Sequence, residues 1–123
     1  MKPISLKYLA INQTFSATLP LPPTSNHRLF PINGRLVKAK ANRNYQKDIA
    51  SLKSNFKPFI KPVGIEIVFY RPRLAGDIDG RIKTLFDALS GIIYEDDGQI
   101  EYMSVWNKKD KDDPRVELVA YEL

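Results

Sequence analysis

A closely spaced group of carboxylates, with a lysine among them, occupies the middle of the chain; its members are Asp77, Asp79, Lys83, Asp87, Asp96 and Asp97. Asp79, Lys83 and Asp87 are spaced by four residues, so they would lie along one face of a helix. Carboxylate oxygens are ligands that Mg²⁺ prefers, and a lysine beside them can hold a phosphate or stabilise charge that develops on it. The pattern therefore predicts a divalent-metal site that works on phosphate groups.

The charge of the chain is divided unevenly around this group. Residues 1–61 hold 11 Lys and Arg and a single acid, whereas residues 62–123 hold 8 basic and 13 acidic side chains. A basic surface attracts a polyanion, and carboxylates within it can hold a metal ion against that polyanion. Together these features indicate phosphodiester chemistry on nucleic acid.

A basic belt is the expected contact surface for the nucleic-acid backbone. Its residues, with two arginines that flank the acids, are Arg28, Arg35, Lys38, Lys40, Arg43, Lys47, Arg73 and Arg81. Contacts to phosphates position a protein on nucleic acid without reading its sequence. The alternative is that these side chains only keep the surface solvated.

The acidic residues also have simpler structural explanations. Asp79 could cap the helix that follows it, and Asp96-Asp97-Gly98 could be only a turn. Lys83 and Asp87 could be an exposed pair worth a few tenths of a kcal/mol. Stability alone does not require so many like charges in one region. The apolar run Ile92–Tyr94 would anchor the second acidic segment in the core and so hold its acids in place.

The composition excludes several classes of protein. The chain has no Cys, which rules out disulfides, thiolate zinc sites and cysteine catalysis, and is compatible with a reducing cytoplasm. No apolar run is long enough for a membrane-spanning helix, and the N-terminus at Met1–Ile4 lacks the long apolar core of a signal peptide. We expect one domain over residues 1–123, with residues 1–12 either its beginning or a short N-terminal extension.

Periodicity in the first half predicts a strand, a hairpin and a helix. Phe15–Leu19 alternates like a strand, and the prolines of Pro20–Pro23 enforce an extended segment after it. Asn33-Gly34 is a turn signal for a hairpin. A helix is expected over about residues 42–55, ended by Pro58. Its apolar positions are Tyr45, Ile49, Leu52 and Phe56.

The second half predicts strands on either side of another helix. Val63–Tyr70 is rich in β-branched and aromatic residues, as are Glu101–Asn107 and Val116–Tyr121. Between them, an apolar stripe predicts a helix that Ser90-Gly91 ends; its positions are Ile82, Leu85, Phe86 and Leu89. The order predicts an α+β fold: one mixed or antiparallel sheet with two main helices packed on it. If the strand at 101–107 pairs beside that at 63–70, the Asp96-Asp97 loop approaches the first acids.

These residues resemble the RusA family of Holliday-junction resolvases of bacteria and phages. That family has the pattern Asp-x-Asp-Asn-x-x-Lys-x-x-x-Asp-Ala-Leu, followed by an Asp-Asp pair. Residues 77–89 follow this spacing with one exception, Asp96-Asp97 stands in place of the later pair, and Phe15–Asn26 is similar to the family's opening strand and Pro-Pro segment. The resemblance extends from about residue 13 to the C-terminal end.

The resemblance implies roles for the acidic residues and a partner. Asp77, Asp79 and Asp97 would be the catalytic, metal-binding carboxylates and Lys83 the catalytic or phosphate-contacting lysine. Asp87 would support them. Asp96 would assist the metal or only orient Asp97. The enzyme would act in DNA recombination and repair as a homodimer that uses Mg²⁺ or Mn²⁺ to make paired, symmetric nicks in four-way DNA.

Some features leave alternatives open. Gly80 stands where the family usually has Asn, so an amide that could donate hydrogen bonds is missing. A protein that binds branched DNA without cutting it is therefore the alternative function, and acids that are structural or bind calcium are a third. For a dimer interface the candidates are Ile92, Ile93 and Met103, and Trp106 is expected in the core or at a dimer contact.

Overall fold

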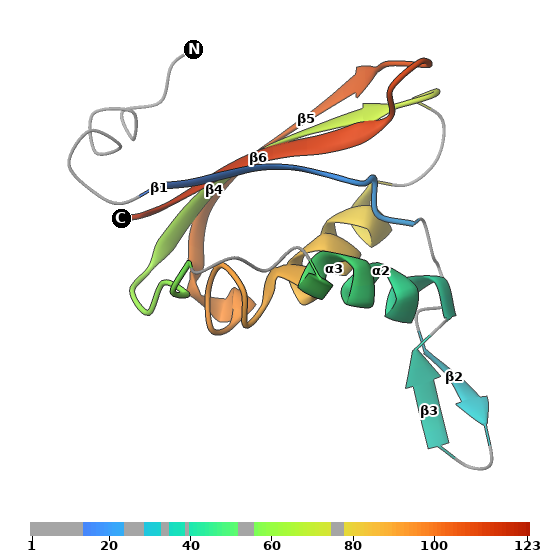
Figure 1. The fold of residues 1–123 in the computed structure, drawn as a ribbon, viewed down its shortest axis with the longest axis horizontal. Helices are drawn as coiled ribbons and strands as arrows, with labels where there is room; N and C mark the ends of the chain where they lie inside the picture. Colours follow the sequence, from blue (N-terminus) through green and yellow to red (C-terminus); the bar gives the residue numbers. More distant parts are fainter. Residues whose placement is uncertain (1–13, 24–28, 33–34, 39, 52–55, 75–77) are drawn as a thin grey trace.

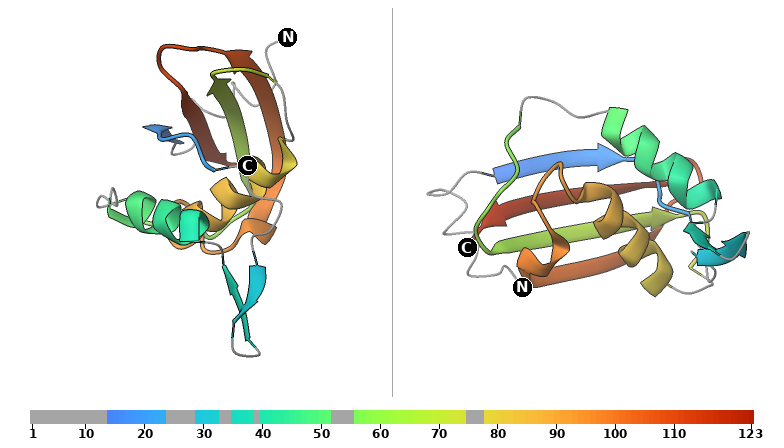
Figure 2. Two further views of the ribbon diagram at one scale, coloured as in Figure 1. Left: turned by 90° about the vertical axis from the view of Figure 1, so that its right-hand side faces the viewer. Right: turned by 90° about the horizontal axis from the view of Figure 1, so that it is seen from below.

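The computed structural model describes residues 14–23, 29–32, 35–38, 40–51, 56–74 and 78–123. Its elements are β1 (Thr14–Leu19), β2 (Leu29–Ile32), β3 (Arg35–Lys38), α2 (Lys40–Ser51), β4 (Val63–Arg71), α3 (Asp79–Leu89), the 3₁₀ turn η1 (Asp97–Gln99), β5 (Ile100–Lys109) and β6 (Arg115–Glu122). They form two layers, with both helices on one face of a four-stranded sheet (Figures 1 and 2). The predicted α+β fold is confirmed.

The main sheet is mixed, with the strand order β1-β6-β4-β5. β4 and β5 are parallel neighbours joined by α3, whereas β6 is antiparallel to both β1 and β4. The expected pairing of the strand after the acids beside the strand before them is therefore confirmed. This arrangement places α3 and the segment before β5 on the same side of the sheet.

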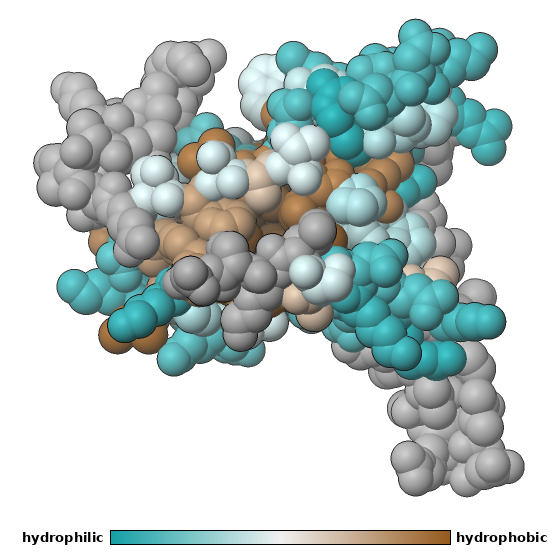
Figure 3. All heavy atoms as spheres, in the orientation of Figure 1, coloured by the Kyte–Doolittle hydropathy of each residue, from teal (hydrophilic) through white to brown (hydrophobic). Residues whose placement is uncertain are grey.

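The core lies between the sheet and the helices, because alternate residues of the central strands point toward α2 and α3. On β4 these are Val63, Ile65, Ile67 and Phe69, all fully buried. The helices contribute Tyr45, Ile49, Leu85, Ala88 and Leu89. Figure 3 shows hydrophobic residues in a band between the two layers and hydrophilic residues over α2.

Helix α2 is confirmed and begins at Lys40, slightly before the expected start. It is described as far as Ser51, and its expected end near residue 55 lies outside the described residues. Tyr45 and Ile49 are buried as expected, but Leu52 lies outside the described residues. At Ser51, the last described helical residue, the hydroxyl donates to the Asp48 carbonyl at 2.6 Å.

The predicted hairpin is confirmed as a separate two-stranded sheet. β2 and β3 pair antiparallel, from Leu29 opposite Lys38 to Ile32 opposite Arg35. The hairpin projects away from the helical layer, apart from the main sheet (Figure 1). The hairpin directly precedes α2 in the sequence, and both belong to the basic residues 1–61.

Of the two places expected for Trp106, the core is excluded and a dimer contact stays a prediction, whereas the expectation that Ile93 contacts a second copy is wrong. Trp106 is 59% exposed, so it does not belong to the core, because β5 is an edge strand and Trp106 points to the helix-free face. Ile93 is completely buried and cannot contact another molecule as it stands. Within the described residues no helix is long and apolar enough to cross a membrane.

Candidate active site

Helix α3 carries three of the predicted residues on its solvent side. Its core face is formed by Thr84, Leu85, Ala88 and Leu89, and this burial fixes the rotation of the helix. Asp79 and Lys83 are consequently exposed, and Asp87 is half-buried. Asp79 precedes Lys83 by one turn, about 6 Å along the axis. Asp79 is the first helical residue, not the cap: the N-cap is Ile78, which makes no side-chain cap bond.

The lysine joins carboxylates from two segments. Lys83 Nζ lies 3.0 Å from Asp87 Oδ1 and 3.4 Å from Asp97 Oδ2. The hydrogen bond that Lys83 donates to Asp87, followed by the charges of Asp87 and Asp97, raises the pKa of Lys83, so the amine is an ammonium at neutral pH. The side chains are 49%, 27% and 31% exposed, which leaves the cluster accessible from solvent. Carboxylates of α3 and of the turn before β5 thus converge on one cation.

Asp97 is presented by a tightly bonded turn. Asp96 is the N-cap of η1, and its Oδ2 accepts a hydrogen bond from the Gly98 N–H at 2.9 Å. The Gln99 side chain accepts from the backbone of Asp96 in return, which completes a capping box. Asp96 therefore shapes the turn that carries Asp97, and whether it also assists the metal stays a prediction.

A polar network behind the site holds α3 against α2. Asn42 Nδ2 donates to the Thr84 hydroxyl at 3.1 Å, and that hydroxyl donates to the Gly80 carbonyl at 2.9 Å. Asn42 and Thr84 are buried, with 4% and 1% exposure. Tyr94 is also buried beside the acids; its hydroxyl donates to the Phe86 carbonyl at 2.9 Å, and burial raises its pKa. The helix that carries Lys83 is thereby anchored on its inner side.

The basic residues are placed differently from one another. On α2, Lys40 and Lys47 are exposed and Arg43 is half-buried, and Arg73 is exposed after β4. Arg35 and Lys38 belong to β3, while Arg28 lies outside the described residues. Arg81 is half-buried, its guanidinium donates to the Pro22 carbonyl, and burial followed by the charge of Arg71 lowers its pKa. Arg81 thus binds the N-terminal segment of the fold and does not project freely.

The oxygen donors suit a hard divalent cation. Asp87 and Asp97 already surround one positive charge, that of Lys83, and Mg²⁺ needs only one or two protein carboxylates in addition to water and substrate oxygens. In the part of the chain that is described, no three His, Asp or Glu side chains converge as metal ligands. Asp77, the first predicted ligand, lies outside that part.

Comparison with known proteins was made at the level of families and of individual proteins. The sequence profile described as endodeoxyribonuclease RusA matches residues 20–120, most of the 123-residue chain. The chain belongs to the RusA family. No individual curated protein matches it. Membership in the RusA family supports nuclease activity on DNA, and the match includes both acidic segments, α2 and the hairpin.

Gln99 and Asn42 of this RusA domain were not among the residues predicted from the sequence. Gln99 could have been found, because Asp96 and Gln99 have the spacing of a capping box. Asn42 stands three residues before Tyr45 and seven before Ile49, on the buried face of α2, where a polar side chain requires a partner.

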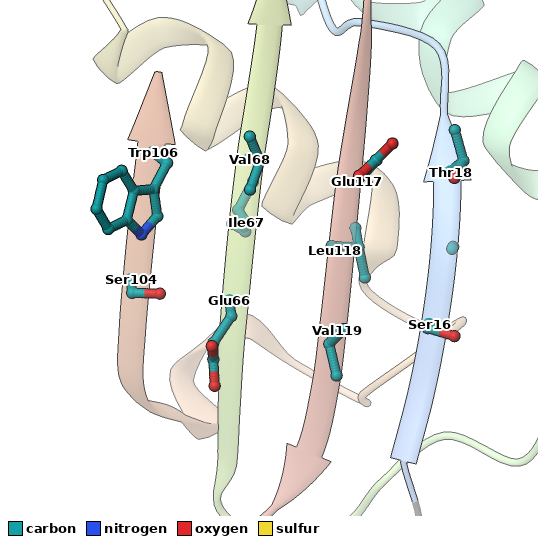
Figure 4. A pocket seen from close by; sticks show the side chains of 11 residues that line it. Ser16, Thr18, Glu66, Ile67, Val68, Ser104, Trp106, Glu117, Leu118 and Val119 are labelled. Atoms are coloured by element: carbon teal, nitrogen blue, oxygen red, sulfur yellow. The ribbon is translucent and has the colours of Figure 1, made fainter. Parts of the chain in front are cut away.

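A separate groove lies on the helix-free face of the RusA sheet, away from the acids (Figure 4). Its volume is about 520 Å³, and its walls include Ser16, Thr18, Glu66, Ser104, Trp106 and Glu117. The residues that line it include no Lys, Arg or His. A groove bearing two carboxylates and no cation is unsuited to the DNA backbone, so the candidate site remains the cluster around Lys83.

Proposed function

We propose that this RusA-family protein is a metal-dependent endonuclease that resolves four-way DNA junctions by paired, symmetric nicks in recombination and repair. The observation that carries the proposal is the convergence of Asp87 and Asp97 on Lys83 from two separate segments. Exposed basic residues on α2 and after β4 support binding of a DNA backbone near this cluster.

We propose a separate role for each residue of the cluster. Asp97 and Asp79, with Asp77, would hold Mg²⁺ or Mn²⁺, and the bound ion would polarise the scissile phosphate and lower the pKa of attacking water. Lys83 is a cation at neutral pH and can donate to a phosphate oxygen as negative charge grows there. Asp87, which is closer to Lys83 than Asp97 is, would keep the ammonium in place when Asp97 binds the ion.

Cleavage of a synthetic four-way junction and of a linear duplex, with Mg²⁺, Mn²⁺ or chelator, tests this function. We expect nicks in the junction only, in symmetric pairs, and only with metal. Asp97→Asn should abolish nicking and leave junction binding intact, because removal of a negative charge does not weaken attraction to DNA. Glu95→Gln is the matched control: it removes the same charge from the same exposed loop and should cut normally.

Lys83→Met separates catalysis from binding. We expect it to reduce the nicking rate far more than the junction affinity, since Lys83 would act on charge that develops during the reaction. Equal losses of rate and affinity would reduce Lys83 to a phosphate anchor. Tight junction binding by the wild type without nicks under any metal condition would establish the alternative, a DNA-binding relative impaired at Gly80.

We further propose that two copies associate along β5, so that two sites can act on symmetric strands. β5 is an edge strand of the described sheet, and it carries the exposed apolar residues Tyr102, Met103 and Trp106. Sedimentation velocity should report a dimer. Met103→Lys should shift it to a monomer, whereas Leu123→Lys, at another exposed apolar position, should not. A wild-type monomer would refute the dimer.

A further inference from the structure

The Gln99 side chain makes more hydrogen bonds than its exposed neighbours in the acidic turn. Its Oε1 accepts from the N–H groups of Glu95 and Asp96, at 2.8 and 2.9 Å. Its Nε2 donates to the carbonyls of Phe59 and Lys61, at 2.8 and 3.0 Å. Both amide hydrogens and both oxygen lone pairs are thereby used. The amide has only one workable orientation, because the reverse would set donors against donors and acceptors against acceptors.

These bonds connect the acidic turn to a rigid part of the fold. Phe59 is 3% exposed, and its N–H donates to the Ile93 carbonyl at 2.7 Å, so its peptide is fixed by the core. The residues held on the other side of the Gln99 amide, Glu95 and Asp96, are exposed. Few apolar contacts hold such a segment, and its order then depends on its hydrogen bonds.

Asp97 lies inside the segment that Gln99 fastens. Asp96, before it, is bound through its N–H to Gln99 and through its carboxylate to the Gly98 N–H. The Gln99 N–H donates to the Asp96 carbonyl at 3.1 Å, which closes the turn around Asp97. The Asp97 carboxylate, which accepts a hydrogen bond from Lys83, is therefore carried by a turn that the Gln99 amide bonds to the carbonyls of Phe59 and Lys61.

We propose that Gln99 is a positioning residue that fixes the Asp97 carboxylate for metal binding. The inference rests on the proposed function, in which Asp97 is a metal ligand. All four side-chain hydrogen bonds of Gln99 are made with backbone groups, so it would act on Asp97 through the backbone of the turn. Groups that orient a metal ligand typically change metal affinity or activity by about 10- to 100-fold when they are lost.

Two substitutions of Gln99 test the proposal from opposite directions. Gln99→Met keeps the length of the side chain and removes all four hydrogen bonds. Gln99→Glu keeps the acceptor atom but replaces the donor to Phe59 and Lys61 with a carboxylate oxygen. Through charge alone, Gln99→Glu would tighten cation binding beside Asp97, whereas a loss of positioning weakens it. The two explanations therefore predict opposite signs for this variant.

The first measurement is Mn²⁺ affinity by isothermal titration calorimetry on the folded full-length chain, with nicking of the four-way junction as a second readout. We expect Gln99→Met and Gln99→Glu each to weaken Mn²⁺ binding by about 10-fold. The Mn²⁺ concentration for half-maximal nicking should rise in parallel, and junction affinity in chelator should change less than twofold. Asp110→Ala is the control, since it removes the caps of the Asp112 and Asp113 N–H groups in a turn far along the chain.

The outcomes separate the inference from the proposed function. Unchanged Mn²⁺ affinity in folded Gln99 variants, or tighter binding by Gln99→Glu, would overturn the positioning role and leave the nuclease function standing. A similar loss in Asp110→Ala would overturn it as well, because any weakened turn would then suffice. Failure of the wild type to bind Mn²⁺ or to nick the junction would instead refute the proposed function. If Gln99→Met does not fold, Gln99→Glu decides.

Discussion

The buried hydroxyl of Thr84 offers a sharp test of how the helices are held together. Thr84→Val preserves the volume and removes the hydroxyl that accepts from Asn42 Nδ2 and donates to the Gly80 carbonyl. Asn42 is 4% exposed, and its Oδ1 has no hydrogen-bond partner among the described residues. The substitution therefore leaves a whole amide buried without a partner.

The expected cost is that of one unsatisfied buried polar group, about 1–3 kcal/mol. With a melting shift of about 4 °C per kcal/mol for a domain of this size, a loss of about 2 kcal/mol lowers the melting temperature by about 8 °C. Urea unfolding should show a lower midpoint with an unchanged slope. Thr18→Val is the matched control: Thr18 is exposed on β1, so the same substitution should change stability by less than about 0.5 kcal/mol.

A double-mutant cycle separates the hydrogen bond from packing. Asn42→Leu combined with Thr84→Val removes both polar groups, and replacing both partners with apolar groups of similar shape can be nearly neutral. The double variant should therefore recover most of the loss of Thr84→Val, with a coupling of about 1–3 kcal/mol. Strictly additive effects, or a Thr84→Val variant as stable as wild type, would refute the network as the link between α2 and α3.

Further predictions concern other parts of the fold. Gly64→Ala should destabilise by about 1–3 kcal/mol, because a Cβ there would lie 2.6 Å from Tyr121 Cε2; thermal unfolding measures this, and a neutral effect would show that the ring can move. Gly91→Ala meets no neighbour within 4 Å but has a φ of 83°, so it should cost about 1–2 kcal/mol from the backbone alone. The hydrogen bond from Arg115 holds the pKa of Asp110 below its usual range. Its stabilisation is present above the ordinary carboxyl pKa and is lost as the pH falls through the lowered one, so Asp110→Asn should melt below wild type at pH 7 and like wild type in strong acid; a constant gap would contradict this.

The sequence predicted the sheet and helices well because their signals are local. The β-branched and aromatic residues of Val63–Tyr70 and the apolar stripe around Leu85 were sufficient to define β4 and α3, and Ser90-Gly91 ended α3 as expected. The start of α2 was predicted to within about two residues, because the buried positions Tyr45 and Ile49 define its apolar face. The exposure of Trp106 depends on strand order, which a hydropathy pattern does not contain.

For the candidate site, the sequence predicted which residues take part better than it predicted the contacts between them. The spacing of Lys83 and Asp87 predicted their ion pair, since both lie on one helix face. The approach of Asp97 to Lys83 depends on the parallel pairing of β4 with β5, which was expected only as one arrangement. The network through Asn42 and the bonds from Gln99 to Phe59 and Lys61 were not foreseen, because each joins segments about 40 residues apart.

The strand order has a consequence for how the chain folds. In the described sheet β1 pairs only with β6. Thr14–Leu19 therefore cannot pair until β6, about 100 residues later in the sequence, is available. Contacts between residues this distant in sequence slow folding, because the entropy of closing the long loop is lost before the contacts stabilise the fold. During synthesis β4, α3 and β5 emerge before β6, and β4 then shows an unpaired edge until β6 inserts. Residues 115–122 therefore act as the closing strand of the nascent protein, and mutations there should reduce the yield of native enzyme more than mutations of equal cost in β5.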